Sequence, residues 1–528
     1  MIKTTCLAAL LLATAAPALA DTAYVNANGY TLGDGGTLLR FATLVVDDAG
    51  KVKATLPAGA PLPRGKKIDV QGRTLLPGLI DAHGHVMSLG ERALAVDLSE
   101  TMSLAAAQAA IRANAGTGGW IRGGGWNQER WGLGRFPTAV ELDAATGNRP
   151  AVLRRVDGHA VWVNSAAIKL AGITAATPDP AGGRIERDAA GNPNGVLVDA
   201  AMKLVGAVVP PLSSAENDAA LAKSLVIMAS VGLTGAHDAG VDRATWDRYR
   251  RFAAQGKLPA RLYAMASGPD NRAAIAPDGP IGWRDDDKLA MMAMKLQADG
   301  ALGSRGAWMA DDYSDAPGNK GLPFFEDGNL RRIILEASAK GFQTNVHAIG
   351  DAANGAVLAA FAAIPASQRA ALRHRDEHAQ IVNTGDLPRF ARLGIIASIQ
   401  PTHATSDKGM VEARIGEARL AGGSDFPDEP PNPFYGLHAA VTRQSRDGAP
   451  PQGWRMAEAM TMQQAFAAFT TGAAWAGHAE GKVGTLTPGK WADFIITGQD
   501  PFAVAPADVW RVRVDETWLG GKRVFLRK

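Results

Sequence analysis

Short apolar runs that end in polar residues recur along the middle of this chain, and they constrain its fold more than any other feature. They lie in VGLTGAHDAG (231–240), AMKLQADGALGSR (293–305), FQTNVHAIGDAA (342–353), RDEHAQ (375–380), GIIASIQPTH (394–403) and RLAGGSDFP (419–427). Helical stretches separate some of them, at 221–230, 330–340 and 352–363. Strands that alternate with helices favour parallel βαβ units, and a closed barrel of eight is the commonest way to use that many. We therefore predict an α/β fold built on a TIM-like (β/α)8 barrel.

The two ends of the chain carry a different pattern, in which short alternating apolar runs are broken by Asp, Gly and Asn. These are strand and turn signals. We expect residues 21–75 and 476–528 to form one small β-sandwich together, with the barrel over 76–475. Residues 86–230 form a longer segment than the connection between two consecutive barrel strands requires. They include the Trp- and Gly-rich piece GGWIRGGGWNQERWGLGRFP. This segment is predicted to be a cap insertion.

Residues 1–20 have the pattern of a cleavable secretory signal. Lys3 precedes an apolar stretch over 6–16, and the small residues ALA stand just before Asp21. Cleavage after Ala20 would make the protein periplasmic or secreted. A membrane anchor is the alternative, but this stretch is shorter than the ~20 residues that a spanning helix needs, so we expect no stable membrane insertion. The single cysteine, Cys6, lies within this signal, so the mature chain has no disulfide.

Charge and composition exclude one class of function. The chain has 55 Lys and Arg against 52 Asp and Glu, and these residues are scattered. A nucleic-acid protein would gather its cations into a patch or stripe. Hydrophobic residues make up 46% and charged residues 20%, which is an ordinary globular balance. We expect a small-molecule substrate and no nucleic acid.

The stretch PGLIDAHGHV (77–86) places two histidines one residue apart after an apolar run. If 79–85 is a strand, Asp81, His83 and His85 share one face. Imidazole is the commonest metal ligand, yet a pair needs further partners to hold a metal. Polar residues that close other predicted strands supply such candidates, namely Lys295, His347, His378 and Asp425. Six ligands with nitrogen and oxygen donors suit two divalent cations, of zinc, manganese or iron.

Each of these candidates also has a plain structural interpretation. His347 and His378 could be satisfied core histidines, and a lysine is by default a surface salt-bridge residue. Apolar neighbours disfavour exposure of Lys295. As an ammonium it would repel a metal, so it serves as a ligand only when carbon dioxide converts it to an anionic carbamate. A mononuclear site is the alternative.

Four further residues are candidates for contact with substrate, namely His159, His237, Arg305 and Trp126. His159 could instead form hydrogen bonds within the cap, and His237 with Asp238 could support the ligands or simply cap a loop. Trp126 lies near Trp120 and Trp131 in the insertion, where tryptophans more often pack than line a pocket. His403 follows a candidate seventh strand and is a weaker pocket candidate.

Six stretches resemble the amidohydrolase superfamily, and specifically the amidohydrolase 3 family, which includes N-substituted formamide deformylases. They are PGLIDAHGH, MKLQADGALGSRGA, NVHAIGDAA, RDEHAQ, GGSDFP and GTLTPGKWADFIIT. The resemblance runs from about residue 25 to the C-terminus. It implies a barrel with a small β-sandwich and, by family habit, a homodimer. The ligands it implies are His83 and His85 after strand 1, Lys295 after strand 4, His347 after strand 5, His378 after strand 6 and Asp425 after strand 8. Gln297 departs from the apolar or aromatic residue that relatives often carry, which alters the pocket wall and not the metal set.

The resemblance also implies a reaction. We expect a metal-dependent hydrolase of carbon–nitrogen bonds other than peptide bonds, acting on an N-substituted amide or formamide. Two zinc ions, with manganese or iron as alternatives, and a carbamate on Lys295 would form the site. Metal-bound hydroxide would attack the substrate with Asp425 as general base. An esterase or lactonase could use the same site, and a catalytically silent barrel that acts as a binding protein is a hypothesis of another class. The presence of all six ligand types argues against the silent barrel.

Overall fold

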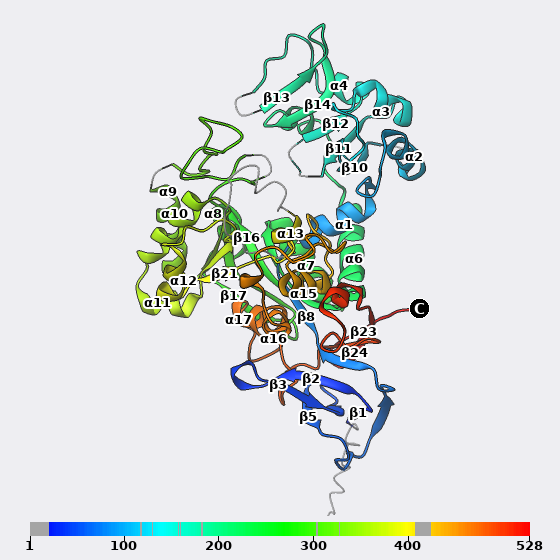
Figure 1. Ribbon diagram of the computed structural model, residues 1–528, viewed down its shortest axis with the longest axis vertical. Coiled ribbons are helices and arrows are strands. Elements are labelled where there is room, and N and C mark those ends of the chain that lie inside the picture. The colour runs from blue at the N-terminus through cyan, green and yellow to red at the C-terminus, as the bar shows by residue number, and fades with distance from the viewer. Residues whose placement is uncertain are drawn as a thin grey trace, which may run out of the picture.

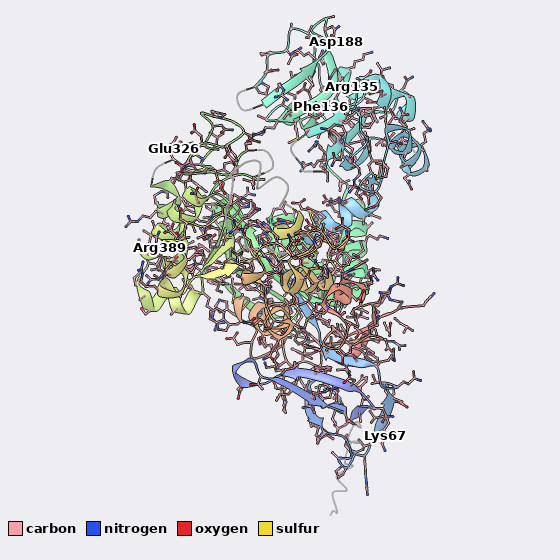
Figure 2. The ribbon with its side chains drawn as sticks, in the orientation of Figure 1. Lys67, Arg135, Phe136, Asp188, Glu326 and Arg389 are labelled. Atoms are coloured by element: carbon pink, nitrogen blue, oxygen red, sulfur yellow. The ribbon has the colours of Figure 1, made fainter. Side chains whose placement is uncertain are left out.

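The computed structural model describes residues 21–116, 119–128, 130–156, 158, 160–180, 183–302, 305–326, 328–406 and 424–528. The predicted signal segment and His159 lie outside these ranges. Three bodies follow one another along the long axis: the sandwich in blue and red, the barrel, and the cap in cyan (Figure 1). Lys67 of the sandwich and Asp188 of the cap lie at opposite ends of the molecule (Figure 2).

The barrel is a parallel sheet that closes almost completely. Its seven strands follow one another in the order β8 (Leu79–Gly84), β15 (Leu233–Val241), β16 (Arg261–Ser267), β18 (Leu289–Gln297), β19 (Gln343–Ala348), β20 (Arg375–His378) and β21 (Ile396–Ser398). A parallel bridge between Gly84 and Phe426 takes the eighth position. The backbone N–H of His85 donates to the carbonyl of Phe426 there, at 2.8 Å. The predicted TIM-like α/β barrel is confirmed, with a bridge in place of a full eighth strand.

Helices cover the outside of this sheet. The three predicted helices are α6 (Ser214–Ser230), α9 (Asn329–Ala339) and α10 (Asp351–Ala362). Others are α1 (Val86–Leu94), α7 (Arg243–Ala254), α8 (Gly268–Ile275), α11 (Ala366–Leu372), α12 (Leu387–Leu393), α15 (Pro433–Thr442) and α16 (Met462–Ala467). Buried leucines, isoleucines and valines of strands and helices form one large core. Gly90 allows α1 to approach α6 closely, because a Cβ there would collide with the carbonyl of Ala220.

Within the described ranges no single helix is both long and apolar enough to span a bilayer. Only α10 and α11 taken together meet that length and composition, and they are bent by 114° relative to each other.

The sandwich joins the two ends of the chain, as predicted. One sheet has the order β5 (Val52–Leu56), β4 (Thr43–Val46), β1 (Thr22–Val25) and β6 (Lys66–Asp69). The other has the order β24 (Lys522–Leu526), β23 (Val514–Leu519), β22 (Phe494–Thr497), β7 (Thr74–Pro77), β2 (Asn28–Leu32) and β3 (Leu38–Phe41). Tyr24 of the first sheet packs edge-on against Phe494 of the second, with ring centres 4.8 Å apart. Phe494 in turn stacks on Trp518 at 5.3 Å. Aromatic contacts between the two sheets therefore bind the C-terminal strands to the N-terminal ones.

The cap is a six-stranded sheet with helices on both faces. Its order is β13 (Gly183–Arg187), β14 (Pro193–Asp199), β12 (Ala160–Val163), β11 (Ala151–Arg155), β10 (Ile121–Trp126) and β9 (Val96–Asp97). Trp162 belongs to the core shared with α2 (Leu104–Asn114) and α3 (Ala139–Thr146). Its neighbours Val161 and Val163 face α4 (Ser165–Leu170) and α5 (Met202–Gly206). The helices α1 and α6, which the predicted insertion included, pack in the barrel core.

The carboxyl group of Asp376 is buried without any partner for its oxygens among the described residues. Arg375 and Glu377 contact groups inside the barrel, so strand alternation turns Asp376 toward the helices. Its side chain is fully buried, and neither oxygen has a hydrogen-bond partner among the described residues. Burial, followed by repulsion from Glu377 and Asp299, raises the pKa of Asp376 well above its usual value. Burial therefore favours the protonated form of this carboxyl in the folded protein.

We predict that Asp376→Val stabilises the fold by about 1–3 kcal/mol, because a desolvated polar group without partners is removed. The raised pKa sets the sign of the pH dependence. Above pH ~4 the unfolded chain releases this proton and the folded chain keeps it, so the wild-type stability falls as pH rises. The gain in melting temperature should be larger at pH 8 than at pH 5. Asp376→Asn is the control, because it abolishes ionisation and leaves polar atoms buried. Lower melting temperatures for Asp376→Val at both pH values would contradict this account.

Candidate active site

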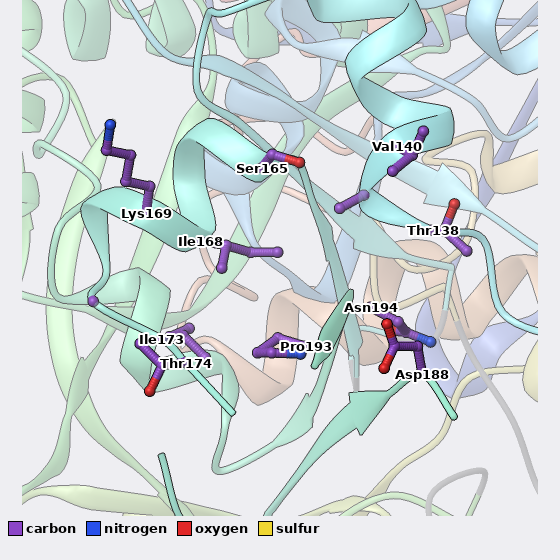
Figure 3. Close-up of a pocket in the computed structure, with 12 residues that line it drawn as sticks. Thr138, Val140, Ser165, Ile168, Lys169, Ile173, Thr174, Asp188, Pro193 and Asn194 are labelled. Carbon is purple, nitrogen blue, oxygen red and sulfur yellow. The ribbon is translucent and has the colours of Figure 1, made fainter. Parts of the chain in front are cut away.

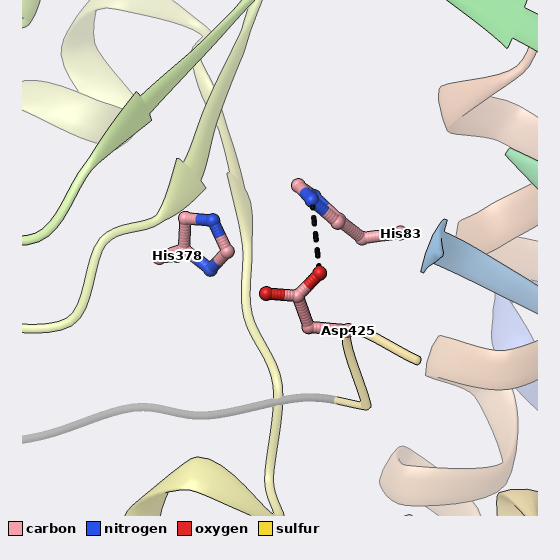
Figure 4. Close-up of side chains that lie close together, drawn as sticks. All are labelled: His83, His378 and Asp425. Carbon is pink, nitrogen blue, oxygen red and sulfur yellow. Dashed lines mark ion pairs between the residues drawn. The ribbon is translucent and has the colours of Figure 1, made fainter. Parts of the chain in front are cut away.

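The carboxyl ends of the barrel strands bring predicted ligands into one buried group. Nε2 of His83 lies 3.5 Å from Oδ1 of Asp425, and Nε2 of His85 lies 3.2 Å from the same oxygen. Ligand atoms of His83, His378 and Asp425 all lie within 4.8 Å of one another (Figure 4). The ring of His347 is centred 4.5 Å from that of His378. Five of the six predicted ligands therefore meet at one rim of the barrel.

The first pair of histidines is placed differently from the prediction. Strand β8 ends at Gly84, so His85 is the residue before helix α1 and not a strand residue. Asp81 shares the strand with His83 but accepts hydrogen bonds from the backbone N–H of His83, at 2.9 Å, and from the hydroxyl of Ser424. Asp81 therefore ties strand β8 to the eighth barrel position.

Two of the ligands have an unusual backbone conformation. His378 has φ 76° and Asp425 has φ 49°. Left-handed φ values are uncommon for residues other than glycine, and such strain gathers at functional sites. Asp376, two residues before His378, faces the helices, so the turn at His378 breaks the strand alternation and directs its ring into the site.

Lys295 lies at the same end of the barrel, at strand β18, where it is in register with Ser267 of β16 and Asn345 of β19. Its side chain is buried. Burial lowers the pKa of Lys295, although Glu377 and Asp425 act in the opposite direction. Burial therefore favours the neutral amine, which is the form that reacts with carbon dioxide.

Burial favours the neutral form of three imidazoles in this group. Burial, followed by the charge of Lys295, lowers the pKa of His347 to about 3. Burial also lowers the pKa of His83 and, more strongly, of His378. For Asp425, burial raises the pKa, but the neighbouring His83 and His85 outweigh it and hold the pKa well below its usual value. Neutral imidazoles beside a carboxylate are the forms that bind divalent cations.

The buried polar atoms of this group that lack hydrogen-bond partners among the residues described fit a metal. Nε2 of His83 and Oδ1 of Asp425 are both buried, and neither makes a hydrogen bond with any residue that the structure describes. Buried polar atoms without a partner are rare and call for a physical explanation. Nitrogen and oxygen donors in this combination are the ligands that zinc accepts, and manganese or iron as well.

The sequence did not reveal the residues that contact the second ring nitrogen of His83 and of His378. Nδ1 of His83 lies 2.6 Å from Oε2 of Glu377, and Nδ1 of His378 lies 2.7 Å from Oε1 of Gln400. Arg375 pairs with Glu377 at 2.8 Å, with both side chains fully buried. A signal for this pair was present in RDEH, because charged residues in a strand that closes on a ligand need buried partners.

The predicted substrate contacts are not gathered at the ligands. His237 is buried inside the barrel, where its Nδ1 lies 2.9 Å from Nη1 of Arg375. Arg305 forms an ion pair with Asp315 at 2.8 Å in the segment after β18. Trp126 is fully buried in the cap core, and its indole N–H donates to the carbonyl of Leu153 at 2.8 Å. Since its ring has no exposed surface, a role in packing replaces the predicted contact of Trp126 with substrate.

A separate cavity of about 580 Å³ lies on the cap (Figure 3). Its walls come from α3, α4 and the turn between β13 and β14. They include one cation, Lys169, and one carboxylate, Asp188, and none of the predicted site residues. This cavity lies apart from the strand-end ligands.

The family model described as "Amidohydrolase family" matches residues 66–525. The chain belongs to the amidohydrolase family. It is therefore a hydrolase by descent, and its strand-end ligands lie within the matched region. The family predicted from the sequence motifs is confirmed.

Individual relatives agree with this family. Amidohydrolase YtcJ of Bacillus subtilis is 33% identical over 494 residues, which cover 88% of this chain and 91% of that protein. N-substituted formamide deformylase of Arthrobacter pascens is 30% identical over 509 residues, which cover 88% of this chain and 90% of that protein. The crystal structure of a metal-dependent hydrolase from Pyrococcus horikoshii superposes with a TM-score of 0.75 at 24% identity, over 92% of this chain and 99% of that one. This last likeness establishes the fold.

We predict that His378→Ala weakens Zn²⁺ binding by more than about 100-fold. Loss of a residue that only hydrogen-bonds to a metal ligand costs roughly 10–100-fold, and loss of the ligand itself should cost more. His478→Ala is the matched control, because His478 is a half-buried histidine that lies after α17 (Ala473–Ala476). Competition with a chromophoric chelator measures both affinities. Equal affinities for the two variants would remove His378 from the site.

Proposed function

We propose that this member of the amidohydrolase family is a metal-dependent hydrolase of carbon–nitrogen bonds other than peptide bonds, and that its substrate is an N-substituted amide or formamide. The buried group of His83, His378 and Asp425 carries this proposal, since two of its polar atoms lack hydrogen bonds within the described ranges. The likeness to N-substituted formamide deformylase supports the choice of substrate class.

The proposed ligands are His83, His85, Lys295 as its carbamate, His347, His378 and Asp425. When bound, divalent cations lower the pKa of water and polarise a carbonyl oxygen. Two zinc ions are proposed, with manganese or iron as alternatives. Lys295 would contribute only as a carbamate, whose formation its buried position and lowered pKa favour.

Asp425 moves the proton in this scheme. Its carboxylate is ionised, so it can accept a proton from the attacking water while the water oxygen bonds to the substrate carbonyl carbon. The same carboxyl then returns the proton to the nitrogen as the carbon–nitrogen bond breaks, which releases an amine and a carboxylic acid. His83 and His85 hold Asp425 in place from one side, at 3.5 and 3.2 Å from its Oδ1.

Ester or lactone hydrolysis is the second candidate, because the same attack on a carbonyl serves a leaving oxygen. A silent barrel that binds a small molecule is the candidate of another class. We also propose that the protein is exported to the periplasm or secreted after cleavage at Ala20, and that it forms a homodimer. The signal pattern of residues 1–20 supports export.

We expect the mature protein, purified without chelator and with bicarbonate, to contain about two equivalents of transition metal, because the six proposed ligands form a two-metal site. Elemental analysis measures this content. Lys295→Ala should retain about one equivalent, because one anionic ligand is lost. One equivalent in the wild-type protein would mean a mononuclear site without Lys295 as a ligand. None after reconstitution would favour the binding protein.

We further expect Asp425→Asn to lower kcat by roughly 10²–10⁴-fold, the usual contribution of a positioned acid–base group. Turnover is followed on an N-substituted formamide and on a formate ester with the same substituent. Faster hydrolysis of the ester would favour the second candidate. Undiminished turnover by Asp425→Asn on both substrates would contradict the role of Asp425.

A further inference from the structure

The guanidinium of Arg375 lies inside the barrel and connects four strands. Its side chain starts on β20 and is fully buried. Nη1 lies 2.9 Å from Nδ1 of His237 on β15. Nη2 donates to Oγ of Ser398 on β21 at 2.8 Å, and to the carbonyl of Ala82 on β8. A buried arginine with partners on this many strands is held in one orientation.

This contact fixes the chemical form of His237. Arginine has donors only and stays protonated, so Nδ1 of His237 must be the acceptor and the ring proton lies on Nε2. Burial, followed by the charge of Arg375, lowers the pKa of His237 well below 6.5. His237 is therefore a neutral acceptor for Arg375, which gives it a role away from the substrate.

Glu377 transmits the orientation of Arg375 to a metal ligand. Oε1 of Glu377 pairs with Nε of Arg375 at 2.8 Å, and Oε2 lies 2.6 Å from Nδ1 of His83. Arg375 is a fully buried cation, so the carboxyl group that pairs with it is required as its anionic partner. An ionised carboxylate can only accept, so Nδ1 of His83 carries the proton. The lone pair of Nε2 is then directed to the side of Asp425.

We infer that Arg375 and His237 are positioning residues that act through Glu377 to hold His83 in the tautomer and orientation that bind metal. This inference rests on the proposed function. This series of contacts reaches His83 and not His378. Nδ1 of His378 lies 2.7 Å from the neutral amide of Gln400, where Nδ1 of His83 contacts the carboxylate of Glu377. One of the two metal equivalents is therefore expected to depend on Arg375.

Zn²⁺ titration of the metal-free full chain tests this inference. Arg375→Lys should lower the affinity for one Zn²⁺ equivalent by roughly 10–100-fold, the range for residues that support a metal ligand through hydrogen bonds. Co²⁺ substitution gives a second readout, since the visible absorption of bound Co²⁺ should change with the geometry at His83. Glu377→Gln should weaken the same equivalent, and adding Arg375→Lys to Glu377→Gln should cause little further loss, because the two residues act in series.

Arg261→Lys is the matched control. Arg261 is also a buried barrel arginine, on strand β16, and it pairs with Asp493 at 2.6 Å and with the carbonyls of Asp286 and Asp287. None of these contacts leads to His83, so the loss of Arg261 should lower the melting temperature and leave both Zn²⁺ affinities unchanged. If Arg375→Lys does not fold, His237→Phe replaces it, with an expected weakening of about 10-fold.

Equal Zn²⁺ affinities and Co²⁺ spectra for wild type and Arg375→Lys, or for wild type and His237→Phe, would overturn the inference and leave the proposed function standing. Equal losses of affinity in Arg375→Lys and Arg261→Lys would overturn it as well, because the effect would then reflect general stability. A wild-type protein that binds no metal would overturn both the proposed function and the inference.

Discussion

Water is excluded from the interior of the closed parallel sheet, so each charge placed there needs a neutralising partner or must give up its ionised form. Arg375 and Glu377 meet this demand as a pair at 2.8 Å, and Arg261 and Asp493 meet it at 2.6 Å. The second pair joins the barrel to the sandwich, and the first lies beneath the ligands. The position of His83 depends on the first pair, and the joint between barrel and sandwich depends on the second.

The parts of the fold that could be predicted are those with a local signal. The alternation of helices with apolar runs predicted the barrel, and the polar residues at the strand ends predicted the ligands. The strand at 261–267 was missed, because RLYAMAS ends in a serine and has no histidine, lysine or carboxylate at its end that singles it out. The placement of Trp126 and His237 depends on which strands become neighbours, as Leu153 and Arg375 are their partners. No local pattern encodes such pairings.

The ligand group also depends on backbone conformations that propensity does not favour. His378 and Asp425 both have positive φ, and the peptide of Phe426 pairs with the end of β8. The prediction of a single face for Asp81, His83 and His85 assumed an unbroken strand. Because β8 stops at Gly84, the two histidines reach Asp425 from a strand and from a helix start.

The sandwich has a consequence for the order of events during synthesis. Strand β7 pairs with β2 on one side and with β22 on the other, and β23 and β24 extend the same sheet. Leu75 and Tyr24 share a core with Phe494 and Trp518, more than 400 residues later in the sequence. The N-terminal strands therefore lack part of their core until the C-terminal strands are made, so the barrel and cap have the whole interval in which to fold first.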